Sequence, residues 1–474
     1  MKKIILFFIF LSTLPAISQT TISMDEVKQA GLCIVEIITN NGEEPQSETI
    51  ESPIFPGVYN LKYKNKVPCR IIISKNGYTL YDSDEYVKNS SGATIRINGN
   101  TTAYFSDSLN MPYKLKLEKA ADLLCRENNN KYKDKEWRLL KDAVSLNTII
   151  GLKISQLLDL EWTSDYTPCN VIINGDYRGC YLLMETMKRN EACRINCDKQ
   201  TGYIIEKDPY WWKEDKYFSS NWYKDNNVYR WSWKYPDADD VNYEQQVYIK
   251  EYIESTEESL SNGNFESFIN ITSFAKWILV HDILGTKDSW GSNMFIKKFD
   301  NTNNSKLELP CVWDFDSSYK ITPGSFSPLH TQENEYFSKL FNSDNRAFIN
   351  MYIDLWNKNK KFILDEITTF LVQYNSSDEA KALDNSRQLY NKRFGYSFTT
   401  VSNDILLTQQ WFNNHLYSLD KNIQILSTNI EKIPYINSKY NKYYNLSGIA
   451  IIKNNKRQII ITKSKDGKKV KMIK

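Results

Sequence analysis

Apolar residues in the first third of the chain follow the pattern of short β-strands. Four runs are β-branched or alternate with polar residues, and turn-forming residues separate them. Asn76-Gly77 and Asn98-Gly99 are two of these turns, because Asn-Gly between β-branched runs is typical of a tight hairpin. A third turn is expected at residues 40–42. The expected strands are residues 33–38, 70–74, 93–97 and 113–117.

The pattern then changes to a helical period. Apolar residues spaced by three and four positions predict a helix over residues 137–160. Two apolar runs, 171–173 and 180–184, flank Asn174-Gly175 and give the clearest hairpin signal in the chain. Residues 205–250 are dense in Trp and Tyr and are expected to be rich in loops. Beyond them we expect helices at 244–260, 268–285, 346–372, 376–392 and 403–430, strands at 294–299 and 309–313, and a small β appendage at 444–474.

A strand-rich first half and a helix-rich second half predict an α+β protein with two lobes. The 474 residues include only 17 Gly and 13 Pro but 12 Trp, 31 Tyr and 21 Phe, which excludes long flexible linkers and disorder. The 60 basic and 57 acidic residues leave a net charge of +3. Without a strong positive field or a clustered basic helix, nucleic acid is not an expected partner.

The N-terminus has the layout of a signal peptide. Lys2 and Lys3 precede an apolar run at 4–14, and small residues follow at 16 and 18. We therefore expect residues 1–18 to be removed and the protein to be exported to the periplasm, the cell surface or the medium. The apolar run is too short for a membrane span, and no transmembrane helix is expected later in the chain. The eight cysteines of such a chain are compatible with one or two disulfides or with buried free thiols.

Candidate chemistry concentrates in residues 281–320. Asp288 is followed five residues later by Asn293, and an apolar run then leads to Asp314-Phe315-Asp316. This order is typical of a phosphotransfer centre, in which one Asp accepts the proton of the acceptor hydroxyl and the later Asn and Asp hold Mg²⁺. Oxygen ligands suit Mg²⁺. Asp and Asn clusters also cap turns and helices, so the spacing alone leaves both interpretations open.

The region upstream has the order of a kinase N-terminal lobe. A strand carries Lys114 and Lys116, either of which could contact phosphate. The expected helix and hairpin follow, and the second hairpin strand runs into Glu185-Thr186-Met187, where a kinase has the hinge that reads the adenine. Strand lysines are also common on solvated faces, so only the joint order of these elements favours a kinase N-terminal lobe.

These segments together resemble the CotH (spore-coat protein H) family of secreted atypical protein kinases, in the form found in Bacteroidetes. The similarity extends from about residue 30 to about residue 430. The segments that carry it are IRINGNTT at 95–102, MPYKLKL at 111–117, EWRLLKD at 136–142, IINGDYRGCYLLME at 172–185, GYIIEKD at 202–208, DSWGSNMFIK at 288–297 and VWDFD at 312–316.

The resemblance implies a two-lobed atypical protein-kinase-like fold and transfer of phosphate from ATP to Ser or Thr of a protein substrate, with Mg²⁺ or Mn²⁺. It assigns Asp288 as the catalytic residue and Asn293 and Asp314 as metal ligands. Asp316 stands where a protein kinase has the Gly after Asp-Phe and could add a second carboxylate to the metal site. Lys114 or Lys116 would contact phosphate, with Lys116 preferred, and Glu185 and Met187 would belong to the hinge. The corresponding organisation is a signal peptide at 1–18, an N-terminal β region at 19–90, an N-lobe at 91–187, a C-lobe at 188–435 and the β appendage at 436–474.

The chain also departs from the family pattern. Asn98 stands where the family commonly has Arg, and the expected helix offers no acidic partner for the lysine, so Glu136 or Asp142 would have to supply it. The alternative function is a catalytically weak surface protein that binds glycan or a cell-envelope partner through the aromatic stretch at 210–233. The same aromatic residues could instead pack in the core between the lobes.

Overall fold

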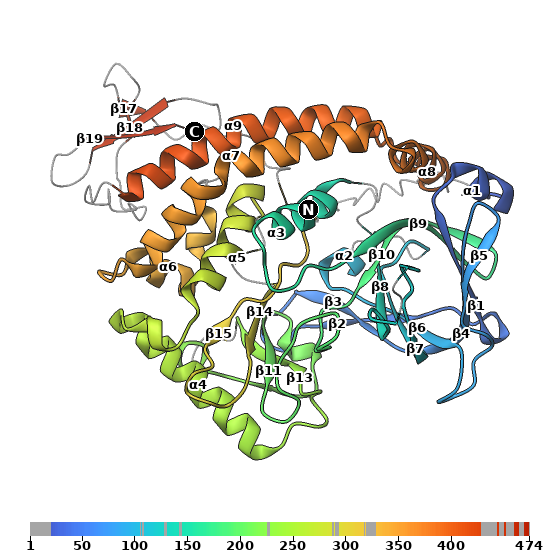
Figure 1. Cartoon of the computed structure of the whole chain (residues 1–474), viewed down its shortest axis with the longest axis horizontal. Coiled ribbons are helices and arrows are strands. Elements are labelled where there is room, and N and C mark those ends of the chain that lie inside the picture. The colour runs from blue at the N-terminus through green and yellow to red at the C-terminus, as the bar shows by residue number, and fades with distance from the viewer. Residues whose placement is uncertain are drawn as a thin grey trace, which may run out of the picture.

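The computed structural model describes residues 20–104, 106, 109–127, 130–141, 145–224, 228–286, 289, 293–316, 318 and 329–427, together with the backbone of four short strands beyond residue 442. The fold is α+β, as predicted. Strands occupy the N-terminal part and long helices the C-terminal part (Figure 1). The proposed signal peptide, at residues 1–18, lies outside the described residues.

The N-terminal strands form a closed barrel, which the local pattern did not predict. The strand order β1-β9-β10-β8-β7-β6-β4 returns to its start because β4 also pairs with β1, and β5 extends from β4. The ladder between β1 and β9 is parallel, whereas the others are antiparallel. The strands are β1 (Cys33–Thr39), β4 (Val67–Lys75), β5 (Tyr78–Asp82), β6 (Ala93–Ile97), β7 (Tyr113–Ala121), β8 (Asp134–Leu140), β9 (Tyr166–Ile173) and β10 (Asp176–Glu185).

Alternation along these strands separates an apolar interior from a polar exterior. Trp137 and Leu139 on β8, for example, point into the barrel with Leu115 on β7, and all three are almost completely buried. The predicted hairpins are confirmed at Asn76-Gly77 and Asn174-Gly175, whereas Asn98-Gly99 leads into helix α2 (Thr101–Tyr104) and not into a tight hairpin. Asn76 and Gly77 have φ of 54° and 82°, and Asn174 and its following glycine have φ of 52° and 80°, the left-handed conformation that such turns need.

The prediction of one helix over residues 137–160 is wrong. Residues 134–140 form strand β8, which pairs with β7 and β10, and helix α3 begins only at Asn147 and ends at Leu157. Adjacent Leu139 and Leu140 suggested a helical face. The two leucines in fact lie on opposite faces of a strand, and tertiary pairing overrides the local pattern.

A second sheet lies beside the barrel. Part of it lies in residues 205–250, which we expected to be rich in loops, and its strand at 294–298 confirms the strand predicted at 294–299. Its order is β12-β13-β11-β14-β15. Residues 309–313, expected as a strand, make no regular ladder, because side chains bind their backbone: the Oγ of Ser273 accepts from Leu309 N, and the Trp277 indole donates to Cys311 O. The strands of this sheet are β11 (Tyr203–Asp208), β12 (Tyr217–Phe218), β13 (Arg230–Tyr235), β14 (Met294–Lys298) and β15 (Leu307–Glu308), and a separate hairpin is formed by β2 (Ser47–Glu51) and β3 (Tyr59–Tyr63).

The five predicted C-terminal helices are confirmed. The two longest, α7 and α9, lie side by side along one edge of the molecule, and α5 packs against both (Figure 1). Helix α8 packs against α1 and the outer face of β10, so it joins the helical part to the barrel. The helices are α1 (Met24–Ala30), α2 (Thr101–Tyr104), α4 (Tyr243–Asn262), α5 (Ile271–Leu284), α6 (Glu335–Asn342), α7 (Ala347–Asn375), α8 (Asp378–Phe394) and α9 (Val401–Ser427); four short strands, β16 (Tyr443–Tyr444), β17 (Ala450–Ile451), β18 (Ile459–Lys463) and β19 (Lys469–Ile473), form a C-terminal sheet.

Candidate active site

A cleft of about 1150 Å³ lies between the outer face of the barrel and the five-stranded sheet. Strands β6, β7 and β8 form one wall, and β11, β13 and residues 313–316 form another. The turn at 97–100, the segment 186–189 and residues 61–63 and 213–215 also line it. Five of the residues predicted from the sequence line this one cleft: Lys114, Met187, Asn293, Asp314 and Asp316. Asp288 lies outside the described residues, so its placement stays a prediction.

The Asp-Phe-Asp segment is fixed by packing behind it. Phe315 is completely buried and stacks on the His281 ring with a centroid separation of 5.6 Å. Gly151 of α3 lies directly against the same ring, where a Cβ would come within 2.7 Å of three ring carbons. The carboxylate of Asp316 accepts a hydrogen bond from Thr102 Oγ1 at 3.2 Å, and Asn147 Nδ2 donates to Asp316 O at 3.5 Å. The two aspartates therefore sit on a backbone that the core positions.

Two of the predicted metal ligands have an unusual backbone conformation. Asn293 has φ of 59° and Asp314 has φ of 61°, both in the left-handed region. Asn and Asp are the residues other than Gly that tolerate this region best, at a cost of about 1–2 kcal/mol. Backbone strain of this kind is concentrated at functional sites, because the surrounding structure must hold it in place. The two residues thus present an amide and a carboxylate to the cleft at the expense of local stability.

Lys114 is the predicted phosphate-binding lysine that lines the cleft, and Glu136 is its partner. Lys114 Nζ lies 2.8 Å from Glu136 Oε2, across the ladder between β7 and β8. Burial lowers the pKa of Lys114 to about 8, although Glu136 opposes the shift. Burial raises the pKa of Glu136, but the charge and hydrogen bond of Lys114 outweigh it and lower that pKa to about 2. The pair is therefore ionised at neutral pH, and Glu136 supplies the acidic partner that the expected helix lacked.

Lys116, which the resemblance favoured, has a different location. It is exposed on β7 and lines a separate hollow of about 600 Å³ with residues 188–192. Although it lies two positions after Lys114 and on the same strand face, it is not among the residues that line the main cleft. The geometry therefore favours Lys114 over Lys116 as the lysine that shares the cleft with Asp314.

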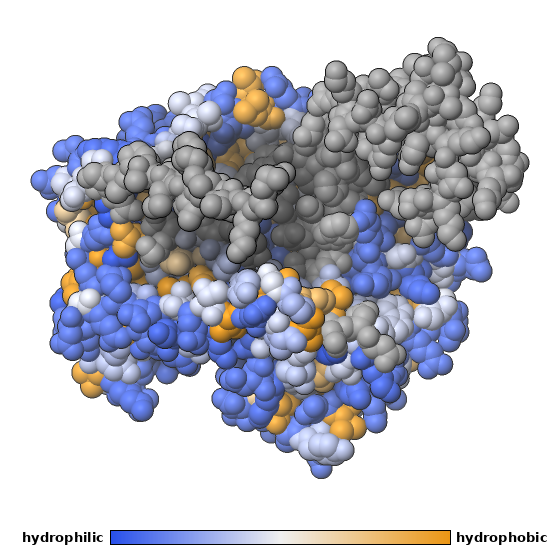
Figure 2. Space-filling view, turned by 180° about the vertical axis from the view of Figure 1, so that it is seen from behind, coloured by the Kyte–Doolittle hydropathy of each residue, from blue (hydrophilic) through white to orange (hydrophobic). Residues whose placement is uncertain are grey.

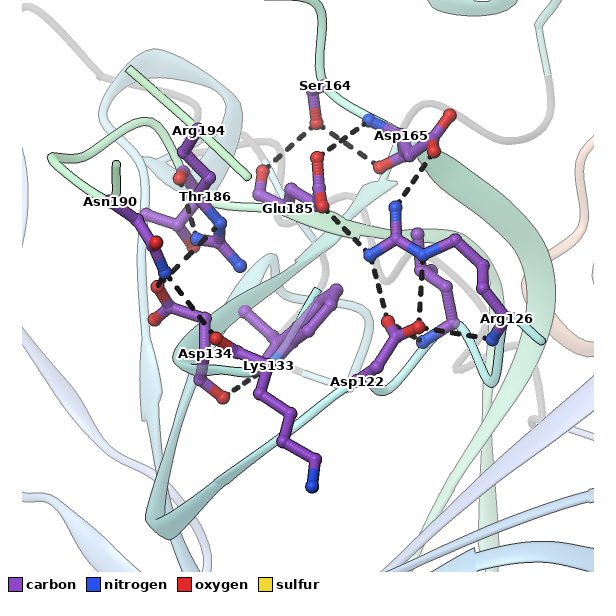
Figure 3. Close-up of polar contacts among 12 residues, drawn as sticks. Asp122, Arg126, Lys133, Asp134, Ser164, Asp165, Glu185, Thr186, Asn190 and Arg194 are labelled. Carbon is purple, nitrogen blue, oxygen red and sulfur yellow. Dashed lines mark hydrogen bonds and ion pairs between the residues drawn. The ribbon is translucent and has the colours of Figure 1, made fainter. Parts of the chain in front are cut away.

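Glu185 and Met187 are also separated by the structure. Met187 lines the cleft, whereas Glu185 is 2% exposed and holds a polar network behind it (Figure 3). Arg126 bridges the carboxylates of Glu185, Asp122 and Asp165 at 2.8–2.9 Å. Burial raises the pKa of Glu185, although Arg194 and Arg126 oppose the shift. Glu185 thus braces the end of β10. The part of the predicted hinge that lines the cleft is 186–187, and the lining continues to residues 188 and 189.

The segment that follows Glu185 is held by a second buried arginine. Arg194 Nη1 donates to Thr186 O at 2.7 Å and to Glu136 O at 3.1 Å (Figure 3). Arg194 therefore joins the candidate hinge at Thr186 to β8, the strand that carries Glu136. Nothing in the local sequence pattern marks either Arg126 or Arg194 as part of the site, because the contacts of Arg126 with Glu185 and of Arg194 with Glu136 join residues nearly 60 positions apart.

Several charged residues of the cleft were missed by the sequence reasoning. Arg138 follows Glu136 by two positions, so reading 134–140 as a strand would have placed it on the same face. Lys213 reaches the turn at 97–100, where its Nζ lies 2.6 Å from Asn100 Oδ1, and burial lowers its pKa to about 8. Burial raises the pKa of Glu206 to about 7, although its ion pair with Lys234 at 2.7 Å opposes the shift.

The aromatic stretch at 210–233 belongs mostly to the core, so the glycan-binding alternative is not favoured. Trp231 is completely buried, Trp211 and Trp233 are each 7% exposed, and Phe218 packs on Trp231 and Trp233. On the face drawn in Figure 2, the described surface is mainly hydrophilic, and its apolar residues lie in small separate groups. The stretch therefore builds the second sheet and one wall of the cleft.

All eight cysteines lie in the described part of the chain, and their thiols are free. Most are buried; burial raises the pKa of Cys69, for example, to about 12. The alternative of buried thiols, rather than disulfides, is thus the one observed. Among the described helices, none has the length and apolar character needed to cross a membrane.

Comparison with known proteins identifies the family. No curated protein matches the chain in sequence. The family model for the CotH kinase protein matches residues 95–393, which is more than half of the chain. The matched region includes the strands, turn and Asp-Phe-Asp segment that line the cleft. This chain belongs to the CotH kinase family.

Proposed function

We propose that the chain is an exported protein kinase that transfers the γ-phosphate of ATP to Ser or Thr hydroxyls of a protein. The observation that carries the proposal is the convergence in one cleft of Lys114 with its partner Glu136, of Asn293, and of Asp314 and Asp316. The barrel and the helical part would serve as the two lobes. Membership of the CotH kinase family supports this assignment.

The residues present fit a divalent metal. Asn293, Asp314 and Asp316 offer one amide and two carboxylate oxygens from the same cleft, the donor set that Mg²⁺ prefers when phosphate and water complete its shell. When bound, the metal would neutralise the charge that develops on the transferred phosphate. Mn²⁺ accepts the same ligands. The role of the protein is to hold these oxygens in a fixed arrangement, and the packing of Phe315 provides that rigidity.

The other residues of the cleft would position the reactants. Lys114, kept charged by Glu136, would bind phosphate oxygens, and residues 186–189 would face the adenine. The acceptor oxygen forms a bond to the γ-phosphorus as the bond to the β-phosphate oxygen breaks, and ADP leaves with that electron pair. Following the family resemblance, Asp288 would accept the hydroxyl proton.

The test is transfer of ³²P from [γ-³²P]ATP to the protein itself or to a Ser-rich acceptor, with Mg²⁺ or Mn²⁺. Asp314→Asn is the informative variant because Asn tolerates the left-handed φ of 61° while the carboxylate is lost. We expect its rate to fall at least about a hundredfold. Asp84→Asn is the matched control, since Asp84 has φ of 60° but is exposed and outside the cleft. A wild-type protein that is inert with both metals, or an Asp314→Asn variant as active as wild type, would contradict the proposal.

A further inference from the structure

Three basic residues form one row across the outer face of the barrel. In the ladders of β6, β7 and β8, Arg96 lies directly opposite Lys114, and Lys114 lies directly opposite Arg138. Directly opposed residues of an antiparallel sheet project to the same face. All three side chains line the cleft that Asp314 also lines. We call Arg96, Lys114 and Arg138 the cationic row.

The charge of the cationic row is only partly balanced. Lys114 pairs with Glu136, whereas within the described residues neither guanidinium forms an ion pair with a carboxylate. Arg96 lies over the Tyr63 ring at 4.1 Å. Arg138 lies over the ring of Trp313 at 5.2 Å, and its Nη1 lies 2.8 Å from the side-chain amide of Asn98, whose oxygen accepts the hydrogen bond once that amide is turned by 180°.

Arg138 keeps further donor capacity. In the described part of the structure its Nε is buried and makes no hydrogen bond. Burial and the neighbouring Arg96 lower the pKa of Arg138 to about 10, although Glu206, Glu136 and Asp314 oppose the shift. Like charges in directly opposed positions are destabilising, and the nearby carboxylates offset this repulsion only in part. An anion that joined the cationic row would relieve the remaining repulsion.

The spacing of the cationic row indicates the kind of anion. Neighbouring strands are about 4.8 Å apart, so the row extends over about 10 Å, farther than one phosphate group reaches. Arginine binds phosphate through two parallel hydrogen bonds. We propose that the cationic row binds the polyphosphate chain of the nucleotide, with Arg96 and Arg138 as binding residues beside Lys114; this inference rests on the proposed function and extends its site.

The cationic row also accounts for the scarcity of glycine in the turn at 97–100. Residues 95–102 contain one glycine, Gly99, with φ of 108°, whereas the loop that covers the phosphates in protein kinases is rich in glycine. A Cβ at this position would lie 3.2 Å from Pro112 Cγ, so the glycine serves the local packing. Side-chain cations would thus replace backbone N–H groups as the phosphate ligands.

The experiment measures binding of ATP, ADP, AMP, adenosine and inorganic tripolyphosphate by isothermal titration calorimetry in the presence of Mg²⁺. The variants are Arg96→Met and Arg138→Met, which keep the apolar stem, and Arg138→Lys, which keeps the charge. The control is Lys119→Met, an exposed cation on β7 that does not line the cleft. Unfolding temperatures and circular dichroism establish that each variant is folded.

We expect each Arg→Met variant to lose at least tenfold in affinity for ATP and tripolyphosphate, with adenosine affinity unchanged. Arg138→Lys should recover part of the loss, and Lys119→Met should bind like wild type. If both Arg→Met variants bind ATP as tightly as wild type, or lose adenosine affinity to the same extent, the cationic row is not a phosphate site, while the proposed function stands. If wild type binds tripolyphosphate through the row but not ATP, the proposed function fails and the row stands. If wild type binds neither, both are overturned.

Discussion

Substitution of Gly151 by Ala tests whether the packing behind Phe315 positions the two aspartates of the cleft. The added methyl group would lie 2.7 Å from the Cγ, Cδ2 and Cε2 atoms of Phe315. Carbon atoms pack favourably at about 3.5–4.0 Å, so the ring would have to retreat by about 1 Å. The ring is completely buried and stacked on His281, so it has no open space to enter. The displacement would therefore pass to the backbone that carries Asp314 and Asp316.

Two magnitudes follow from this geometry. Overpacking a core of this kind costs about 1–3 kcal/mol of unfolding free energy, despite the gain of about 1 kcal/mol in helix propensity on going from Gly to Ala. A shift of about 1 Å in a positioning group reduces catalysis by about a hundredfold. We therefore expect Gly151→Ala to unfold at lower urea concentration than wild type and to transfer phosphate about a hundred times more slowly.

The matched control is Gln156→Ala, an exposed position on the same helix. It should keep wild-type stability and activity. Urea unfolding monitored by circular dichroism gives the first quantity, and initial rates of ³²P transfer give the second. If Gly151→Ala equals wild type in both, the contact between α3 and Phe315 does not position the site, and the reasoning is refuted.

Three further predictions concern the parts around the cleft. Trp231→Ala should lower the unfolding free energy by about 3–5 kcal/mol because Trp231 is fully buried. Trp212 is half-buried, so Trp212→Ala should lower it far less. If chemical denaturation gave equally small losses of unfolding free energy for both variants, the aromatic stretch at 210–233 would not be part of the core. Arg126→Met should cost about 3 kcal/mol, since it removes the ion pair of the buried Glu185 carboxylate and leaves only the more distant charge of Arg194. An unchanged midpoint of urea unfolding would contradict this prediction. The pKa of Glu136 is lowered from 4.5 to about 2, so its pair with Lys114 stabilises the fold above about pH 4.5 and loses that contribution as the pH falls towards 2. The difference in unfolding free energy between wild type and Glu136→Gln, at most about 3 kcal/mol, should therefore narrow between pH 7 and pH 3. A difference that stays constant over this range would contradict the assignment.

Local signals were sufficient for much of the fold. Asn-Gly pairs flanked by β-branched runs predicted two hairpins correctly, and apolar residues at helical spacing predicted the five long C-terminal helices. Closure of the barrel was not predictable in this way. It depends on β1 pairing with both β4 and β9, and the partners in β9 lie more than 130 residues away along the chain.

The candidate site was predicted in outline but not in its partners. The Asp-Phe-Asp motif and Asn293 identified one wall of the cleft. Lys114 and Lys116 project to the same face of β7, so the sequence alone could not decide between them. The structure separates them by their partners across the ladder: Lys114 lies opposite Arg138, whose guanidinium lies over the Trp313 ring, whereas Lys116 lies opposite Glu136. Arg138 itself was hidden because adjacent Leu139 and Leu140 suggested a helix.

The most direct test of the account is to locate the metal in the cleft. Fe²⁺ substituted for Mg²⁺ in the presence of ATP, ascorbate and peroxide cuts the backbone near its binding site, and mass spectrometry identifies the cuts. The account predicts ATP-dependent cleavage near Asn293 and at residues 314–316, and its loss in Asp314→Asn. Cleavage elsewhere in the chain, or cleavage that Asp314→Asn leaves unchanged, would contradict the central claim.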